Sequence, residues 1–270
     1  MRNLGKNLAA AIYREVNVVK IRSIVVCAIA MAVCLWGVAY GDEIIYSESF
    51  DGFDNGDLLG QGGWESIDAL SGGLGSLTVQ SDFVLKGVGK ALKAEAFQEN
   101  HIKWAIPVES GVCYLSIFFS KADAGSNNTL HIYMGKGALA WSAGPVIRIG
   151  SQAGDPAFIG IHDGNDATIV QAAKFNVGEW NHLRAVVDVD SMKFEAYLDG
   201  KSIGKFGFRN ASHNAIEWLM IGFDEGIDLL GYYDSIEFGT GTGEGAYTRA
   251  ISVEPEDKLS TTWGTVKTAY

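Results

Sequence analysis

Cysteine and proline are both scarce in this chain, and each shortage has a structural consequence. Only three of the 270 residues are cysteine and four are proline. Cys27 and Cys34 lie in an apolar N-terminal run, so Cys113 alone remains beyond residue 41. Without that run no intramolecular disulfide can form, and the surrounding VCYLSIFF predicts a buried, inert thiol. Few prolines beside 34 glycines suit strands that use every backbone N–H and turns that need positive φ.

Positive charge is also in short supply. The chain has 21 basic and 32 acidic residues, a net charge of −11. Five of the basic residues and one acid lie in residues 1–41, which leaves a net charge of −15 on residues 42–270. Nucleic-acid binding needs clustered Lys and Arg to neutralise phosphates, so this balance excludes nucleic acid as a partner. Acidic loops can instead hold calcium.

The N-terminus has the pattern of an export signal. Residues 1–22 are basic, and residues 23–41 (SIVVCAIAMAVCLWGVAYG) carry no charge. This order predicts a secretory signal peptide, with the mature chain starting at residue 40 or 42. The run is also close to the roughly 20 residues that span a bilayer, so an uncleaved signal anchor is the alternative. We therefore expect a secreted or cell-surface protein that contacts a membrane only through this segment, if it stays uncleaved.

The remaining sequence reads as short strands without a long amphipathic helix. The clearest stretch runs from Trp180 to Gly204, where His182–Asp190 and Lys193–Leu198 alternate polar and apolar residues. Asp199-Gly200 then supplies the two positive-φ positions of a tight hairpin. Further runs of this kind are Ile44–Phe50, Ser76–Val79, Ala91–Ala96, Val112–Ser120, Thr129–Met134, Val146–Ile149, Phe158–Ile161, Ala167–Val170, Ile216–Gly222 and Gly231–Phe238.

These strands predict a single all-β domain over residues 42–239, built as an antiparallel sandwich or barrel. Residues 240–270 then form a linker and a short C-terminal tail. In that tail Leu259, Trp263 and Val266 share a helical spacing. The tail is either a docking or sorting element, or a segment that packs Trp263 on its own domain or stays disordered.

Three phrases resemble one family. They are ESFDGFDNGDLLGQGGWE near the start, WNHLRAVVDVDSMKFEAYLDGK in the middle and MIGFDEGIDLLGYYDSIEFG near the end. Together they resemble exported bacterial members of the laminin-G-like, concanavalin A-like lectin-glucanase superfamily, over residues 43–239. The resemblance implies an antiparallel two-sheet jelly roll. It also implies binding of a glycan or an extracellular protein, because only some branches are hydrolases.

The catalytic patterns of that superfamily are weak here. The E-x-D-x-x-E strand of laminarinase-type hydrolases is absent, and Asp234 and Glu237 fall on opposite faces of a strand. A lyase set could come from His131, Tyr133 and Arg148, but a polar outer strand face explains them better. We therefore expect a non-catalytic binding module. The alternatives are a glycoside hydrolase or polysaccharide lyase, and a structural or adhesion component of the cell surface.

Carbohydrate binding needs aromatic faces together with hydrogen-bonding side chains. Trp64, Trp180 and Trp218 lie in or beside the family-like phrases and are expected in the core. The predicted ligand-binding residues are Trp141, Trp104, His131, Tyr133, Arg148 and Asn128.

The resemblance also implies one structural calcium ion between the first and last strands. Its expected ligands are Glu48 and Asp51 at the first strand and Asp234 on the last, completed by backbone carbonyls. The loop Phe223–Asp228 is a second candidate. The alternative is that these acids cap turns.

Overall fold

The structure is a computed structural model that describes residues 42–66, 76–96, 100–122, 129–137, 143–150, 157–165, 168–210, 214–223 and 229–251. Four sequence predictions fall outside these residues. They are the leader 1–41, the ligand candidates Asn128 and Trp141, the acids of the second calcium candidate, and the tail helix around Trp263.

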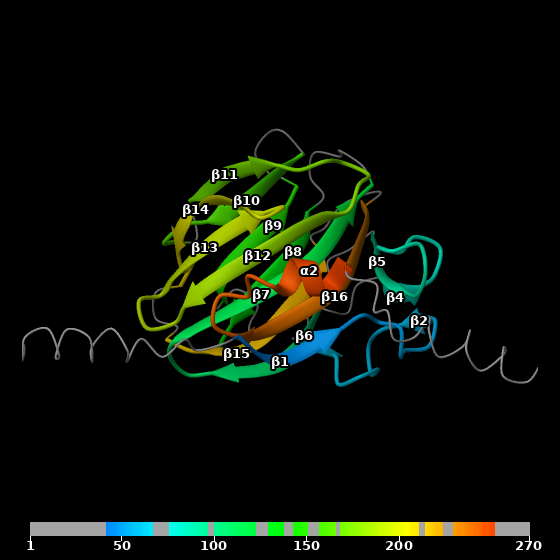
Figure 1. Ribbon diagram of the computed structural model, residues 1–270, viewed down its shortest axis with the longest axis horizontal. Coiled ribbons are helices and arrows are strands. Elements are labelled where there is room, and N and C mark those ends of the chain that lie inside the picture. Colours follow the sequence, from blue (N-terminus) through cyan, green and yellow to red (C-terminus); the bar gives the residue numbers. More distant parts are fainter. Residues whose placement is uncertain are drawn as a thin grey trace, which may run out of the picture. The chain divides into compact units, whose positions relative to one another are not determined.

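The described chain forms two antiparallel sheets, which confirms the predicted fold class (Figure 1). Sheet A has nine strands, in the order β14 (Lys201–Gly207), β13 (Lys193–Leu198), β12 (Asn181–Asp188), β7 (Val112–Lys121), β16 (Leu229–Thr240), β5 (Ala91–Ala96), β4 (Ser76–Gln80) and β2 (Gly56–Asp57), with β1 (Glu43–Glu48) also paired to β16. Sheet B has seven strands, in the order β11 (Ile169–Lys174), β10 (Phe158–His162), β9 (Ala143–Ile149), β8 (Leu130–Gly135), β15 (Ile216–Phe223), β6 (Asn100–Val108) and β3 (Glu65–Ser66).

The core lies between the two sheets. Alternation in β7 turns Leu115, Ile117 and Phe119 inward, and β8 does the same with Ile132 on the facing sheet. These side chains belong to one contiguous buried cluster. Cys113 is fully buried in that cluster, and burial raises the pKa of its thiol to about 12, as the inert-thiol prediction requires.

The hairpin predicted from the sequence is confirmed. β12 and β13 pair antiparallel, with Leu183 opposite Leu198. Asp199 and Gly200 connect β13 to β14 with φ angles of 49° and 77°. Two successive positive φ angles are the requirement that selects Asp-Gly at this position.

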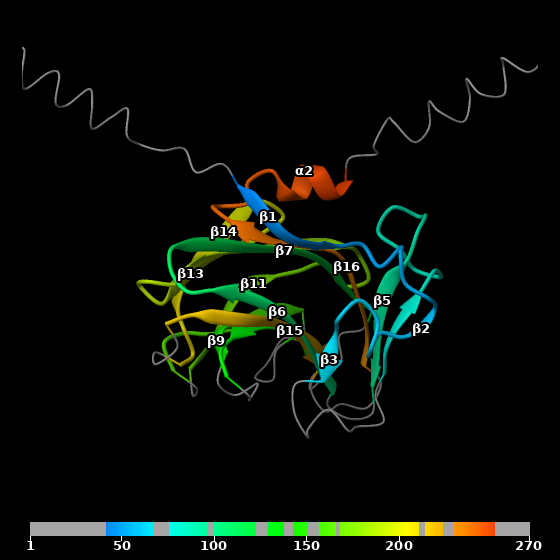
Figure 2. The same cartoon turned by 90° about the horizontal axis from the view of Figure 1, so that it is seen from below.

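The C-terminal side of the domain differs from the predicted linker. β16 extends to Thr240, and helix α2 (Ala246–Ile251) follows it. Figure 2 shows α2 on the outer side of sheet A, away from sheet B. Composition suggested a linker because the stretch is rich in Gly and Thr, yet Gly243 adopts a φ of 62° that turns the chain back onto the sheet. In the part of the chain that the structure describes, no helix is long and apolar enough to cross a bilayer.

Candidate functional site

The outer face of sheet B, which points away from sheet A, gathers polar side chains in its middle. In β8, Ile132 faces the core, so its neighbours His131 and Tyr133 face outward. The register places His131 opposite Arg148 of β9, and Arg148 opposite Gly160 of β10. Three of the predicted ligand-binding residues, His131, Tyr133 and Arg148, therefore share one face.

These side chains are held in fixed positions. The His131 ring stacks on Tyr133 with 4.8 Å between the ring centroids, and its Nε2 lies 2.9 Å from Thr129 Oγ1. All three predicted residues are buried, and the most exposed of them, Arg148, is 7 % exposed. His162, two residues beyond Gly160 on β10, is buried on the same face and was not predicted. Fixed side chains lose little entropy when a ligand binds, which favours recognition.

Trp104 does not belong to this group. It lies on β6 opposite Leu219, whose side chain faces the core, so Trp104 faces inward as well. Its ring stacks on Tyr46 of β1 at a centroid distance of 4.6 Å and sits close against Gly63. A half-buried ring in these contacts anchors β1 to sheet B. The register thus separates Trp104 from the His131 group by placing it on the opposite face of the sheet.

An apolar strip continues the outer face toward one end of the sheet. Tyr133, Val146, Met220 and Trp218 form a second buried cluster, separate from the main core. Trp218 was expected in the core, but it lies on the outer face. Strand β15 (IEWLMIGF) is apolar at both odd and even positions, so alternation alone could not assign its faces.

Two hollows adjoin this strip. A hollow of about 240 Å³ is lined by Trp218 and Glu217 of β15, Glu65 of β3, Ala105 of β6, and the glycines Gly63 and Gly137. A second, of about 380 Å³, lies at the ends of β6 and β8 and shares Glu217. Its other lining residues are Pro107, Val108, Glu109, Lys136, Asn214, Ala215 and Ile216. Glu217 therefore stands between the two hollows.

Glu217 and Trp218 are fixed by the same turn. Gly137 N–H donates to Glu217 Oε2 at 3.0 Å, and Trp218 Nε1–H donates to the Gly137 carbonyl at 2.8 Å. A register shift in β15 between Ile216 and Trp218 leaves Glu217 exposed at this point. Irregularities of this kind commonly aim a side chain at a site. Glu217 is the only polar residue of β15, and that contrast is the signal by which the sequence could have revealed it.

The predicted calcium ligands lie at the other side of the molecule, where β1 ends. Asp51 and Asp234 line a hollow of about 40 Å³ together with Ser49, Ser235, Lys86, Val88 and Lys90. Glu48 does not line it, because its carboxylate accepts a hydrogen bond of 2.6 Å from Phe50 N–H. The structure therefore brings two of the three predicted ligands together.

Asp234 is the more buried of the two acids, with 6 % exposed. Its carboxylate accepts hydrogen bonds from Leu85 N–H at 3.3 Å and Ser235 N–H at 2.6 Å. Burial, reinforced by the charge of Asp51, raises the pKa of Asp234 to about 6. Asp51 in turn accepts Lys90 N–H at 2.7 Å, and Gly89 permits this approach because a Cβ there would meet the Asp51 carboxylate.

Among the described residues, no three His, Cys, Asp or Glu side chains stand close enough to hold a metal by themselves. Two carboxylates and two hydroxyls do fit the oxygen preference of calcium, and the hollow has room for one ion. Lys86 and Lys90 line the same hollow and would weaken cation binding.

No model of a known protein family matches the sequence, and no curated protein matches it. Solved structures do match. A sialidase superposes with a TM-score of 0.53 and 14 % identity, over 74 % of this chain and 19 % of its own. The globular domain of T. cruzi calreticulin superposes with a TM-score of 0.53 and 11 % identity, over 77 % of this chain and 94 % of that domain. The catalytic domain of a glycoside hydrolase family 131 protein from Coprinopsis cinerea superposes with a TM-score of 0.53 and 11 % identity, over 74 % of this chain and 95 % of that domain.

The fold is that of the concanavalin A-like jelly rolls. The resemblance found in the sequence is thereby confirmed at the level of fold. This jelly roll spans only about a fifth of the sialidase it matches, and identities of 11–14 % extend the likeness no further than the fold.

Proposed function

We propose that this protein is an exported, non-catalytic carbohydrate-binding module and that its ligand lies on the outer face of sheet B. The observation that supports this most is the joining of fixed polar side chains, an apolar strip and two hollows on one face. A sugar presents apolar C–H faces and a rim of hydroxyls, so it needs both kinds of surface side by side. The ligand would enter the hollow that Trp218 helps to line, with its hydroxyls on Glu217.

Two of the matched structures carry carbohydrate-active names, a sialidase and a glycoside hydrolase catalytic domain. Those names support a carbohydrate ligand, and the export-signal pattern of residues 1–41 supports a site of action outside the cytoplasm. They also support the competing function, hydrolysis of the bound sugar. The missing E-x-D-x-x-E strand favours binding without reaction.

The test is a screen of the full chain against a panel of neutral and charged polysaccharides, with product analysis on every positive. Glu217→Ala is expected to weaken the binding of any polysaccharide found in this screen about tenfold, because it removes a charged hydrogen-bonding group from both hollows. Glu179→Ala is the matched control, since Glu179 is equally exposed but lies in the turn before β12 of sheet A. Binding should survive in the control. New reducing ends or unsaturated products would replace the proposal by hydrolysis or elimination, and equal losses in both variants would refute the site.

We also propose that the hollow between Asp51 and Asp234 holds one calcium ion. A cation there offsets the desolvation of Asp234 and the repulsion between the two acids. When bound, the ion would supply a fixed positive charge that ties the start of the domain to β16. Because Lys86 and Lys90 share the hollow, binding is expected only at the weak, extracellular end of the calcium range, about 0.1–1 mM.

Calcium at about ten times that dissociation constant should raise the melting temperature of the full chain by a few degrees. Asp234→Asn should abolish the rise, whereas Asp163→Asn, in the turn that follows β10, should keep it. An equal rise in both variants would place the ion elsewhere.

A further inference from the structure

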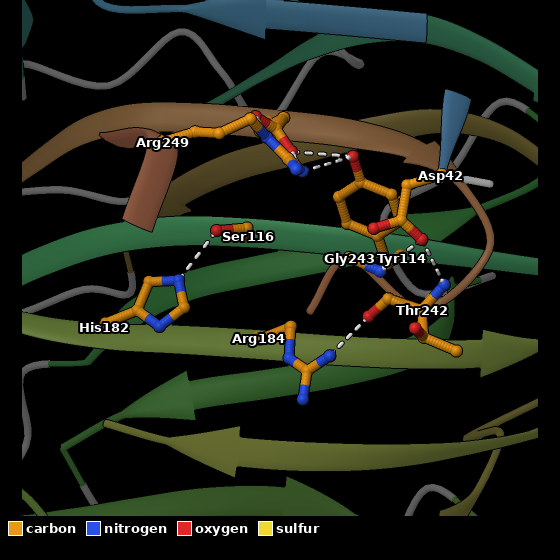
Figure 3. Close-up of polar contacts among 9 residues, drawn as sticks. Asp42, Tyr114, Ser116, His182, Arg184, Thr242, Gly243 and Arg249 are labelled. Carbon is orange, nitrogen blue, oxygen red and sulfur yellow. Dashed lines mark hydrogen bonds and ion pairs between the residues drawn. The ribbon is translucent and has the colours of Figure 1, made fainter. Parts of the chain in front are cut away.

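Helix α2 is the last described element, and two sets of contacts hold it on the outer face of sheet A. Its Tyr247 ring packs on Phe118 of β7 and on His182 of β12, with centroid distances of 5.7 Å and 5.0 Å. Arg249 donates through Nε to Glu237 Oε2 of β16 at 3.0 Å. Figure 3 shows Arg249 beside Tyr114, and His182 beside Ser116 on the neighbouring strand. Docking therefore includes the aromatic contacts of Tyr247, the ion pair of Arg249 and the burial of Ala246 at the start of the helix.

His182 is the residue of this arrangement whose protonation would destabilise the docked helix. Its side chain is 2 % exposed, and its Nε2 lies 2.7 Å from Ser116 Oγ. Within the described structure the buried Nδ1 has no hydrogen-bond partner. A neutral imidazole tolerates this, but a protonated ring would bury an N–H without an acceptor.

The charged groups around His182 come from three elements. Arg184 follows it on the same face of β12 and donates to the Thr242 carbonyl. Glu237 lies on β16 and Arg249 on α2, and the two pair with each other and with the Tyr114 hydroxyl. Burial, with Arg184 acting in the same direction, lowers the pKa of His182 from 6.5 to about 4, against a smaller opposing effect of Glu237.

We propose that α2 is an acid-released latch: protonation of His182 undocks α2 from sheet A, while the sandwich stays folded. Removing Tyr247 opens the His182 ring to water, which lets the positive charge be hydrated. Proton binding therefore favours the undocked helix. If undocking restores the ordinary pKa, acidification shifts the docking equilibrium by at most about 300-fold.

Protonation of Glu237 also favours the undocked helix, but at a lower pH. Arg249 and the Tyr114 hydroxyl lower the pKa of Glu237, so its ion pair persists as His182 begins to titrate. Protonation of Glu237 then removes the second contact. The release should consequently start above pH 4 through His182 and be completed by loss of the ion pair.

Native-state hydrogen exchange on the full chain tests the latch. Protection factors for the α2 amides, corrected for intrinsic exchange, should fall at least tenfold between pH 7 and pH 4.5. Amides of β7 should stay protected over the same range. His182→Phe keeps an aromatic ring against Tyr247 but cannot be protonated, so its α2 protection should be independent of pH until Glu237 titrates. Ser116→Ala is the matched control, since it removes the Nε2 contact but leaves His182 titratable.

Three results would overturn the latch. They are constant α2 protection in the wild type, a wild-type pH response in His182→Phe, or loss of β7 protection together with that of α2. If His182→Phe does not fold, His182→Gln serves the same purpose, because its amide does not titrate near neutral pH.

Discussion

Gly239 shows how one residue holds the first strand in place. It lies on β16 opposite Ile44 of β1. A Cβ built at Gly239 would stand 2.2 Å from the Glu43 carbonyl oxygen and 2.9 Å from the Tyr114 ring. The first of these is backbone, which cannot turn away as a side chain can. The absence of a side chain therefore permits the close pairing of β1 and β16.

Gly239→Ala should accordingly lower the free energy of unfolding by about 1–3 kcal/mol, the usual cost of forcing extra volume into a packed site. Urea unfolding at neutral pH measures this directly. Gly52→Ala is the matched control, because a Cβ at Gly52 meets no atom within 4 Å. Its stability should change by no more than about 0.5 kcal/mol. An equal effect of both substitutions would contradict the role given to Gly239.

At the scale of elements, the sequence could predict strands that have one solvent-exposed face and one buried face. β13 was predicted over its full length and the bounds of β12 to within two residues, because alternation and Asp-Gly turn chemistry agree there. β6 was not predicted, although Ile102, Trp104 and Ile106 alternate in it. Pro107 near its end and charged neighbours weaken its β signal.

The candidate site was only partly predictable for a related reason. Period-two alternation joins residues along one strand, such as His131 and Tyr133, but it cannot tell which strands become neighbours. Arg148 joins them through the β8–β9 register, and Glu65 meets Glu217 only because β3 pairs with β6 beside β15. These are contacts between residues far apart in sequence.

At the scale of the whole molecule, two buried groups affect stability in opposite directions as the pH falls. His182 titrates near 4 when the protein is folded with α2 docked and near 6.5 when unfolded, so the unfolded chain takes up its proton first and the docked fold loses up to about 3 kcal/mol between pH 6.5 and 4. Asp234 titrates near 6 when folded and near 3.8 when unfolded. The folded chain takes up this proton first, and the fold gains about 3 kcal/mol between pH 6 and 3.8.

Single substitutions should separate these two contributions. In EDTA, the stability of His182→Phe relative to wild type should rise by up to about 3 kcal/mol as the pH falls from 6.5 to 4, because the destabilising titration is gone. The relative stability of Asp234→Asn should fall by a similar amount between pH 6 and 4. Urea unfolding at half-unit pH steps gives both curves. Relative stabilities that stay constant with pH would show that these groups are not perturbed in the fold.

The first and last described segments of the chain meet on sheet A, and this has a mechanical consequence. Asp42 accepts hydrogen bonds of 3.0 Å from the backbone N–H groups of Thr242 and Gly243, and Glu43 pairs with Thr240 at the last rung of β16. Tension applied through residues 42 and 251 would therefore act on one end of an antiparallel pair. It would unzip β1 from β16 rung by rung, after α2 and the Asp42 bonds give way, and would not shear the sheet. A domain pulled in this way yields first at its β1 edge, while the outer face of sheet B carries no load.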